Sequence, residues 1–266
     1  HMEEIDIMAE SKTIQSVQRA LDILNCFDDS NTSLSLAQIS EKLSLKKSTT
    51  HGLVSTLSAN GYLFQASPGK YSLGTELARK GVLAEDVRLS ILSQIAEAKF
   101  ESYRFVLTGT LSLYGFSRNK LIKIISLECS PSHYAIKPSD KSDYYATASG
   151  KLLLSTYSNA QLNFFVNHTR FEKLTDKTIC DSEKIKEELQ NIKSSGYAFE
   201  DGEAAVGISA IACPVFDKNK EIMASVSLTS FDENISSAKS TIVSTLKACS
   251  DLITAEFIKF SEPSNH

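Results

Sequence analysis

The segment Ser35–Leu73 constrains the fold of this chain more than any other part of its 266 residues. Its pattern predicts a short helix, a tight turn, a second helix and then a two-stranded hairpin. Ser35 and Gln38 have the spacing of a capping box, so the first helix should begin there. The second helix should begin near Lys47 and end before Gly61, which stands where a left-handed residue closes a helix. This order of elements is that of a winged helix-turn-helix.

Apolar residues at helical spacing predict one small core for this segment. In the second helix the buried stripe should be Leu53, Val54 and Leu57. Ser67-Pro68-Gly69-Lys70 suits a type II turn between the hairpin strands, because glycine accepts the positive φ that this turn needs. An upstream helix from about Thr13 to Phe27 should add its own apolar stripe, made of Val17, Ala20, Leu21 and Leu24.

The opposite face of the second helix has chemistry suited to DNA. His51 and Ser55, which share this face with Ser48 and Ser58, could reach base edges in the major groove. Lysines at the helix start and at the wing tip can meet phosphates, as can hydroxyl and N–H groups at the helix N-terminus. A helical module that binds protein, with solvated lysines, is the alternative. The predicted DNA-contact residues are Lys46, Lys47, Ser48, Thr49, Thr50, His51, Ser55 and Lys70.

Charge is spread unevenly along the chain. The formal net charge is −4, yet residues 11–80 have eight basic and five acidic side chains, and residues 81–266 have 20 basic and 23 acidic ones. Residues 11–80 are thus mildly basic and residues 81–266 mildly acidic. This imbalance indicates that affinity for DNA comes from two copies of the segment 11–80. We therefore expect a homodimer, or a tetramer built as a dimer of such dimers.

Composition also bears on the compartment. No apolar run is long enough to cross a bilayer, and no secretory signal is visible, so we expect a cytoplasmic protein with no membrane partner. The five scattered cysteines indicate reduced thiols.

The remainder of the chain predicts linker helices and then a mixed domain. From Thr75 to about Phe100 the pattern is helical, and Gly81 should interrupt it. We expect a DNA-binding domain at residues 11–75, linker helices at 76–100 and a second domain at 101–262.

Strands placed before, between and after helices favour an α+β fold around a mainly antiparallel sheet flanked by helices. The expected strands are Thr110–Phe116, Leu121–Leu127 around an Arg118-Asn119-Lys120 turn, Tyr134–Ile136, Tyr197–Glu200, Ile208–Val215 and Met223–Thr229. The expected helices are Thr147–Thr156, one from near Asn159, one capped by Asp181 or Ser182 and ending before Gly196, and Ser237–Phe260.

Several ordered segments together resemble the isocitrate lyase regulator (IclR) family of bacterial transcription factors. The resemblance implies a sequence-specific DNA-binding regulator with a GAF-like effector domain, and a linker that adds to dimer contacts; an ordinary helix packed on its own domain is the alternative for that linker. One departure is Gly52, where many relatives have Arg, so the operator sequence of relatives does not transfer. The resembling segments are Ser16–Leu24, Leu34–Leu45, Lys46–Leu63, Tyr71–Gly74, Ala146–Ser155, Gly196–Asp217 and Met223–Ser230.

The same resemblance implies an effector pocket for a small molecule, often a carboxylate. Ser227 and Thr229 lie two apart in a strand, so both hydroxyls face one side. Backbone N–H groups near Ala148–Gly150, at the start of the predicted helix Thr147–Thr156, can receive a carboxylate. The alternative is that these hydroxyls merely fill an alternating strand. The effector-contact residues carried over are Thr147, Ala148, Gly150, Glu200, Ala210, Ser227 and Thr229.

No convincing catalytic arrangement is visible, so we expect neither an enzyme nor a cofactor. Gly150-Lys151 lacks the earlier glycine and the following Ser or Thr of a phosphate loop. Glu200, Asp201 and Glu203 have no Cys or His within four residues, which favours a solvated loop over a metal site. We expect a repressor modulated by a small acid. A ligand sensor acting through protein–protein contacts and a small-molecule enzyme remain the alternatives.

Overall fold

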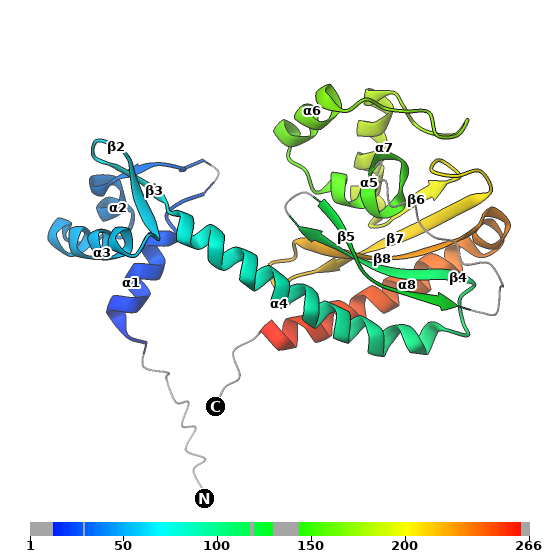
Figure 1. The fold of residues 1–266 in the computed structure, drawn as a ribbon, viewed down its shortest axis with the longest axis horizontal. Coiled ribbons are helices and arrows are strands. Elements are labelled where there is room, and N and C mark those ends of the chain that lie inside the picture. The colour runs from blue at the N-terminus through cyan, green and yellow to red at the C-terminus, as the bar shows by residue number, and fades with distance from the viewer. Residues whose placement is uncertain (1–12, 29, 118–119, 130–143, 262–266) are drawn as a thin grey trace, which may run out of the picture. The chain divides into compact units, whose positions relative to one another are not determined.

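The computed structural model describes residues 13–28, 30–117, 120–129 and 144–261. The chain divides into two compact units, residues 1–86 and 87–266, and each is described by itself. Figure 1 labels the helices and strands. The expected strand Tyr134–Ile136 and the turn residues Arg118 and Asn119 lie outside the described residues.

The first unit is a winged helix-turn-helix, as the sequence predicts. The Ser35 hydroxyl accepts from the Gln38 N–H at 3.3 Å, and the Gln38 side chain accepts from the Ser35 N–H at 2.9 Å. Gly61 has a φ of +75° and Gly69 a φ of +76°, so both glycines adopt the left-handed backbone expected of them. The elements are α1 (Gln15–Leu24), β1 (Leu34–Ser35), α2 (Leu36–Lys42), α3 (Lys47–Ala59), β2 (Leu63–Ser67) and β3 (Lys70–Leu73).

The wing has a third strand that the sequence did not indicate. The two residues of β1 pair antiparallel with β3, which gives the strand order β1-β3-β2. A core beneath the wing joins α1, α2, α3 and β2. Its fully buried members include Ile23, Ile39, Val54 and Leu63, with Leu53 and Leu57 packed against them.

The predicted apolar stripe of the first helix is wrong in part. Val17 is 54% exposed and Leu21 50% exposed, whereas Ile23 is fully buried. The helix turns a different side to the core than its apolar spacing indicated. Ile14, at 69% exposure, extends the exposed apolar face by one more turn.

The helix α4 (Thr75–Phe100) is continuous over 26 residues, so the predicted interruption at Gly81 is wrong. A Cβ built at Gly81 would meet no atom within 4 Å, which shows that nothing in the structure requires a glycine there. The two halves of this helix differ in burial. Val82 and Val87 are exposed, whereas Leu92 and Phe100 belong to the core of the second unit.

The second unit is α+β, built on a five-stranded antiparallel sheet. The strand order is β5-β4-β8-β7-β6. The strands are β4 (Gly109–Ser117), β5 (Lys120–Cys129), β6 (Ala198–Asp201), β7 (Ile208–Phe216) and β8 (Ile222–Phe231). The helices are α5 (Ala148–Ser155), α6 (Asn159–His168), α7 (Ser182–Ser195) and α8 (Asp232–Ser261), with short 3₁₀ turns at Glu101–Tyr103 and Tyr144–Ala146.

The helices α5, α6 and α7 begin at or within one residue of the predicted positions, each after a capping side chain. Thr147 caps α5, Ser158 caps α6 through a capping box, and Asp181 caps α7. Gly196, with a φ of +70°, ends α7. The closing helix begins earlier than predicted, at Asp232, and Ala238 interrupts its helical backbone.

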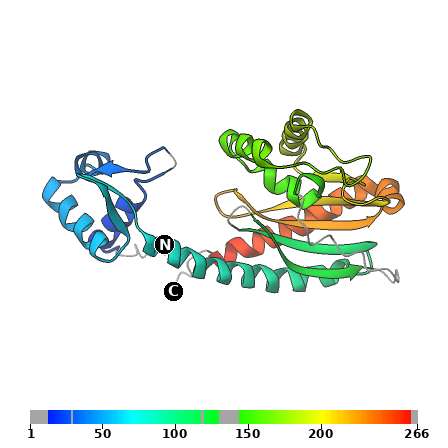
Figure 2. The same ribbon diagram turned by 45° about the horizontal axis from the view of Figure 1, so that its top comes forward.

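Different helices cover the two faces of the sheet (Figure 2), and the side chains of the two faces differ in chemistry. One face packs against α8 and the second half of α4 through aliphatic side chains such as Leu113, Ile211 and Val226. The other face lies beneath α5 and α7, and its central strands present mainly small and hydroxyl side chains. Within the described ranges, no helix is both long and apolar enough to cross a membrane.

Candidate DNA-binding surface and effector site

One face of α3 is polar and open to solvent. His51 and Ser55 are exposed on it, and Lys46 and Lys47 are exposed at the helix start. Ser40 holds the preceding turn, because its hydroxyl donates to the Leu45 carbonyl at 2.6 Å. The turn thereby fixes the angle between α2 and α3, which is what presents a helix to a groove.

Two hydroxyl residues of α3, Thr50 as a predicted phosphate contact and Ser58 as a predicted member of this face, are not available to DNA. Thr50 has no exposed surface, and its hydroxyl donates to the Lys46 carbonyl at 3.2 Å. Its predicted contact with a phosphate is therefore wrong: the hydroxyl completes the first turn of α3 instead. Ser58 is only partly exposed and its hydroxyl is buried, so the open face ends at Ser55.

The other predicted DNA-contact residues stay accessible. Ser48 is exposed at the start of α3, and Thr49 is half-buried. Lys70 is exposed where β3 leaves the turn of the wing. Gly52 lies on the exposed side of α3, and a Cβ there would meet nothing within 4 Å, so a side chain would fit.

The strand register brings the predicted effector residues of the sheet onto one face. One row across the sheet runs Thr110, Thr229, Ala210 and Glu200, because each pairs with the next. Residues paired across antiparallel strands point to the same side. A second row joins Ser112 to Ser227.

This face contains a buried hydroxyl that has no hydrogen-bond partner among the described residues. Ser112 has no exposed surface, and within the described residues its Oγ makes no hydrogen bond. The sequence reasoning missed Ser112, because only its pairing with Ser227 places it beside the predicted site. Leaving a buried hydroxyl unpaired costs about 1–3 kcal/mol, which a bound polar group could recover.

The start of α5 lies against this face of the sheet. The Ser225 hydroxyl donates to the Ser149 hydroxyl at 3.0 Å. Among the N–H groups near Ala148–Gly150 that were expected to receive a ligand carboxylate, that of Gly150 already donates to the Thr147 side chain at 3.1 Å. Ala148 and Ser149 are the first two residues of α5, so their N–H groups have no carbonyl acceptor within the helix.

A buried charged cluster borders the site, and the sequence reasoning placed it wrongly in a solvated loop. Glu200 is 3% exposed and Glu203 5% exposed. Lys151, only 2% exposed, lies 2.5 Å from Glu203 and 3.4 Å from Glu188. Asp201 alone is exposed, and it pairs with Lys177 at 3.1 Å.

Backbone and side-chain hydrogen bonds fix the loop after β6. Glu200 Oε1 accepts from the N–H of Glu203 and from that of Ala204. The hydroxyls of Thr175 and Thr178 donate to the carbonyls of Gly202 and Glu203, both at 2.7 Å.

The pKa of Glu200 is raised to about 7, and burial of its carboxyl group is the main cause. Burial also raises the pKa of Glu203.

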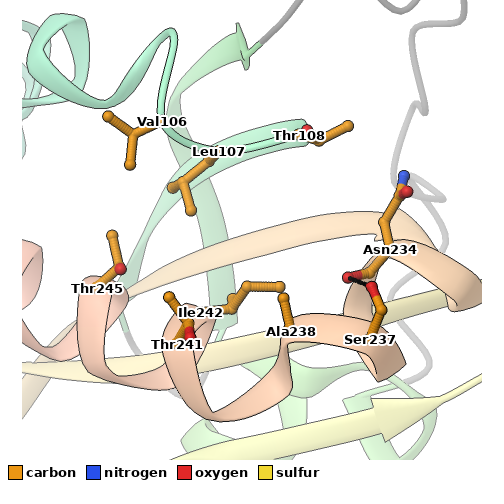
Figure 3. Close-up of a pocket in the computed structure, with 9 residues that line it drawn as sticks. All are labelled: Val106, Leu107, Thr108, Asn234, Ser237, Ala238, Thr241, Ile242 and Thr245. Carbon is orange, nitrogen blue, oxygen red and sulfur yellow. Dashed lines mark hydrogen bonds between the residues drawn. The ribbon is translucent and has the colours of Figure 1, made fainter.

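A separate hollow of about 250 Å³ lies between α8 and the segment that leads into β4 (Figure 3). Its lining includes Leu107, Thr108, Thr241 and Ile242 and contains no charged side chain. It shares no residue with the predicted effector set. Within the described residues no cluster of three or more His, Cys, Asp or Glu side chains could hold a metal ion.

A helix-turn-helix unit and a separate α+β unit define the class: a helix-turn-helix transcriptional regulator. Residues 16–67 match the IclR helix-turn-helix domain, and residues 138–255 match the bacterial transcriptional regulator IclR C-terminal domain. The chain is 30% identical to the transcriptional regulator XynR of Escherichia coli over 85% of this chain and 90% of that protein. It is 26% identical to the transcriptional repressor IclR of Escherichia coli over 81% of this chain and 80% of that one. The chain belongs to the IclR family of transcriptional regulators.

Solved structures agree on the fold. A regulator of this family from a Rhodococcus species superposes with a TM-score of 0.63 at 21% identity, covering 96% of this chain and 97% of that one. A homologue from Microbacterium hydrocarbonoxydans, complexed with 4-hydroxybenzoate, superposes with a TM-score of 0.58 at 20% identity, covering 92% and 99%.

Proposed function

We propose that this regulator is a repressor whose affinity for operator DNA changes when a small carboxylate metabolite binds in its second unit. The observation that best supports the DNA role is the open polar face of α3 with lysines at its start. Accessible cations supply sequence-independent contacts to phosphates, and polar side chains in the groove supply sequence preference. His51 and Ser55 are the side chains that we assign to base edges.

The effector role is supported by the polar face of the sheet. Ser112 and Ser227 lie side by side on it, and the start of α5 adds N–H groups of positive potential. A carboxylate with a further polar group would satisfy these donors together. The 4-hydroxybenzoate bound to a homologue has both a carboxylate and a hydroxyl group.

Homodimer formation is the third part of the proposal. Ile14, Val17 and Leu21 form an exposed apolar row on α1 at helical spacing. Such a row is costly to leave in water, and a second copy of the chain would cover it. The two DNA-binding units of a dimer would bind two half-sites that lie about one helical turn, or a multiple of it, apart.

The DNA role is tested by a mobility-shift titration with the region upstream of the chain's own gene, in the presence of excess unrelated DNA. We expect a retarded complex that unrelated DNA does not displace, and loss of that preference in His51→Ala. A chain that binds every DNA equally, or none, would contradict the proposal.

A further inference from the structure

We propose that Glu200 meets the acid effector as a neutral carboxylic acid, so that effector binding takes up a proton at this side chain. The inference rests on the proposed function, because it concerns the same site. Glu200 is the acidic end of the row that runs through Thr229 and Ala210. An anionic ligand in this site would therefore approach a buried carboxylate.

The hydrogen bonds of Glu200 leave one oxygen for a proton. Both N–H donors of the following loop, from Glu203 and Ala204, meet Oε1. A carboxylic acid protonated on Oε2 keeps these two bonds and gains one O–H donor. That donor can meet a ligand carboxylate, which an ionised Glu200 would repel.

The charged groups around Glu200 do not remove this repulsion. Lys151 of α5 is the nearby cation, but it lies in ion pairs with Glu203 of the loop and Glu188 of α7. Lys177, before α7, pairs with Asp201 at 3.1 Å. Each ammonium group already has a carboxylate partner. A bound anion would thus add negative charge to a site where Lys151 and Lys177 are already paired with carboxylates.

The Glu200 side chain is already close to the neutral state near physiological pH. Burial raises the pKa of Glu200 to about 7, so the residue is mostly ionised at about pH 8 and mostly neutral at about pH 6. A bound anion stabilises the neutral form further. By linkage, binding above about pH 7 should take up close to one proton, and affinity should fall up to about tenfold per pH unit.

Calorimetric titration of the full chain with pyruvate and with 4-hydroxybenzoate tests the inference. The titrations run from about pH 6 to about pH 8, in buffers of different ionisation enthalpy, so that proton uptake is counted directly. Wild-type protein should take up nearly one proton at about pH 8 and very little at about pH 6.

Glu200→Gln is the decisive variant. Glutamine keeps the acceptor oxygen for the two loop N–H groups and supplies a permanent donor in place of Oε2. We expect binding without proton uptake, and tighter binding than the wild type at about pH 8. Glu221→Gln is the matched control: it removes an exposed carboxylate between β7 and β8, outside the charged cluster, and it should keep the wild-type pH dependence.

The outcomes separate the inference from the proposed function. Binding without proton uptake in the wild-type protein, or the same uptake in Glu200→Gln, overturns the inference and leaves the effector role intact. Absence of binding by both acids at every pH contradicts the carboxylate effector itself, and the inference falls with it. Proton uptake by the wild-type protein is measured without any variant. If Glu200→Gln fails to fold, this measurement still tests the inference.

Discussion

Hydrogen-bond partners separate the side chains of α3 that can meet DNA from those that hold the helix in place. Thr50 and Ser48 are similar in chemistry and lie only two positions apart. Thr50 has no exposed surface and bonds to the Lys46 carbonyl, whereas Ser48 is exposed. Helical spacing alone would have excluded Thr50, because it lies four residues before the buried Val54.

Replacing Lys47 with alanine should weaken binding to every DNA sequence alike. The exposed ammonium group is assigned to a phosphate, so its loss should lower the slope of log affinity against log salt by roughly one. Fluorescence anisotropy at a series of salt concentrations measures that slope. Lys218→Ala, an exposed lysine in the second unit, is the control and should leave it unchanged. An unaltered slope in Lys47→Ala would remove this residue from the phosphate contacts.

Glu200 should also make stability depend on pH. Its pKa is about 7 in the folded chain against an ordinary value of 4.5, so the folded state holds the proton more tightly. The stability that it contributes is present below about pH 4.5 and is lost as the pH rises through about 7. Urea unfolding at several pH values should therefore show a smaller decline over this interval in Glu200→Gln than in the wild type. Equal declines would show that Glu200 keeps an ordinary pKa.

At the scale of elements, the sequence predicts best where local rules decide. Ser35, Ser158 and Asp181 each bond to N–H groups of the helix that follows, and these helices begin where expected. Gly69 and Gly196 adopt positive φ, so the wing turn and the end of α7 also agree. These features depend on neighbours within a few residues, which the sequence contains.

Features that depend on distant partners could not be predicted in the same way. The burial of Lys151 depends on Glu203, which lies 52 positions further along the chain. The position of the buried Ser112 hydroxyl beside Ser227 depends on strand register, and the exposure of Val17 depends on which side of α1 packs on the small core. Much of the fold could thus be predicted from sequence, but only part of the effector site.

Two glycines in helices should respond in opposite ways to alanine. Gly81→Ala should stabilise the chain by up to about 1 kcal/mol, because α4 is continuous there and a methyl group meets nothing. Gly150→Ala should destabilise it, because the new Cβ would lie 2.4 Å from the Tyr144 carbonyl oxygen. Thermal unfolding of both variants measures the contrast. Destabilisation by Gly81→Ala would mean that α4 bends at that position.

At the scale of the whole molecule, we propose that the DNA-binding unit and the sensing unit act together in a homodimer. The exposed row on α1 should contribute to that dimer. Val17→Asp with Leu21→Asp should raise the monomer fraction in analytical ultracentrifugation and weaken operator binding, because charges would replace the apolar contact. Lys218→Ala again serves as the control. An unchanged association would show that α1 plays no part in the assembly.

Operator affinity with and without a bound acid tests the central claim most directly. Anisotropy with the operator fragment should give affinities that differ at least about fivefold once pyruvate or 4-hydroxybenzoate saturates the protein, since coupling between sites is typically about 1–3 kcal/mol. By reciprocity, the operator should change the affinity for the acid by the same factor. Identical operator affinities with and without an acid that calorimetry shows to be bound would contradict the account.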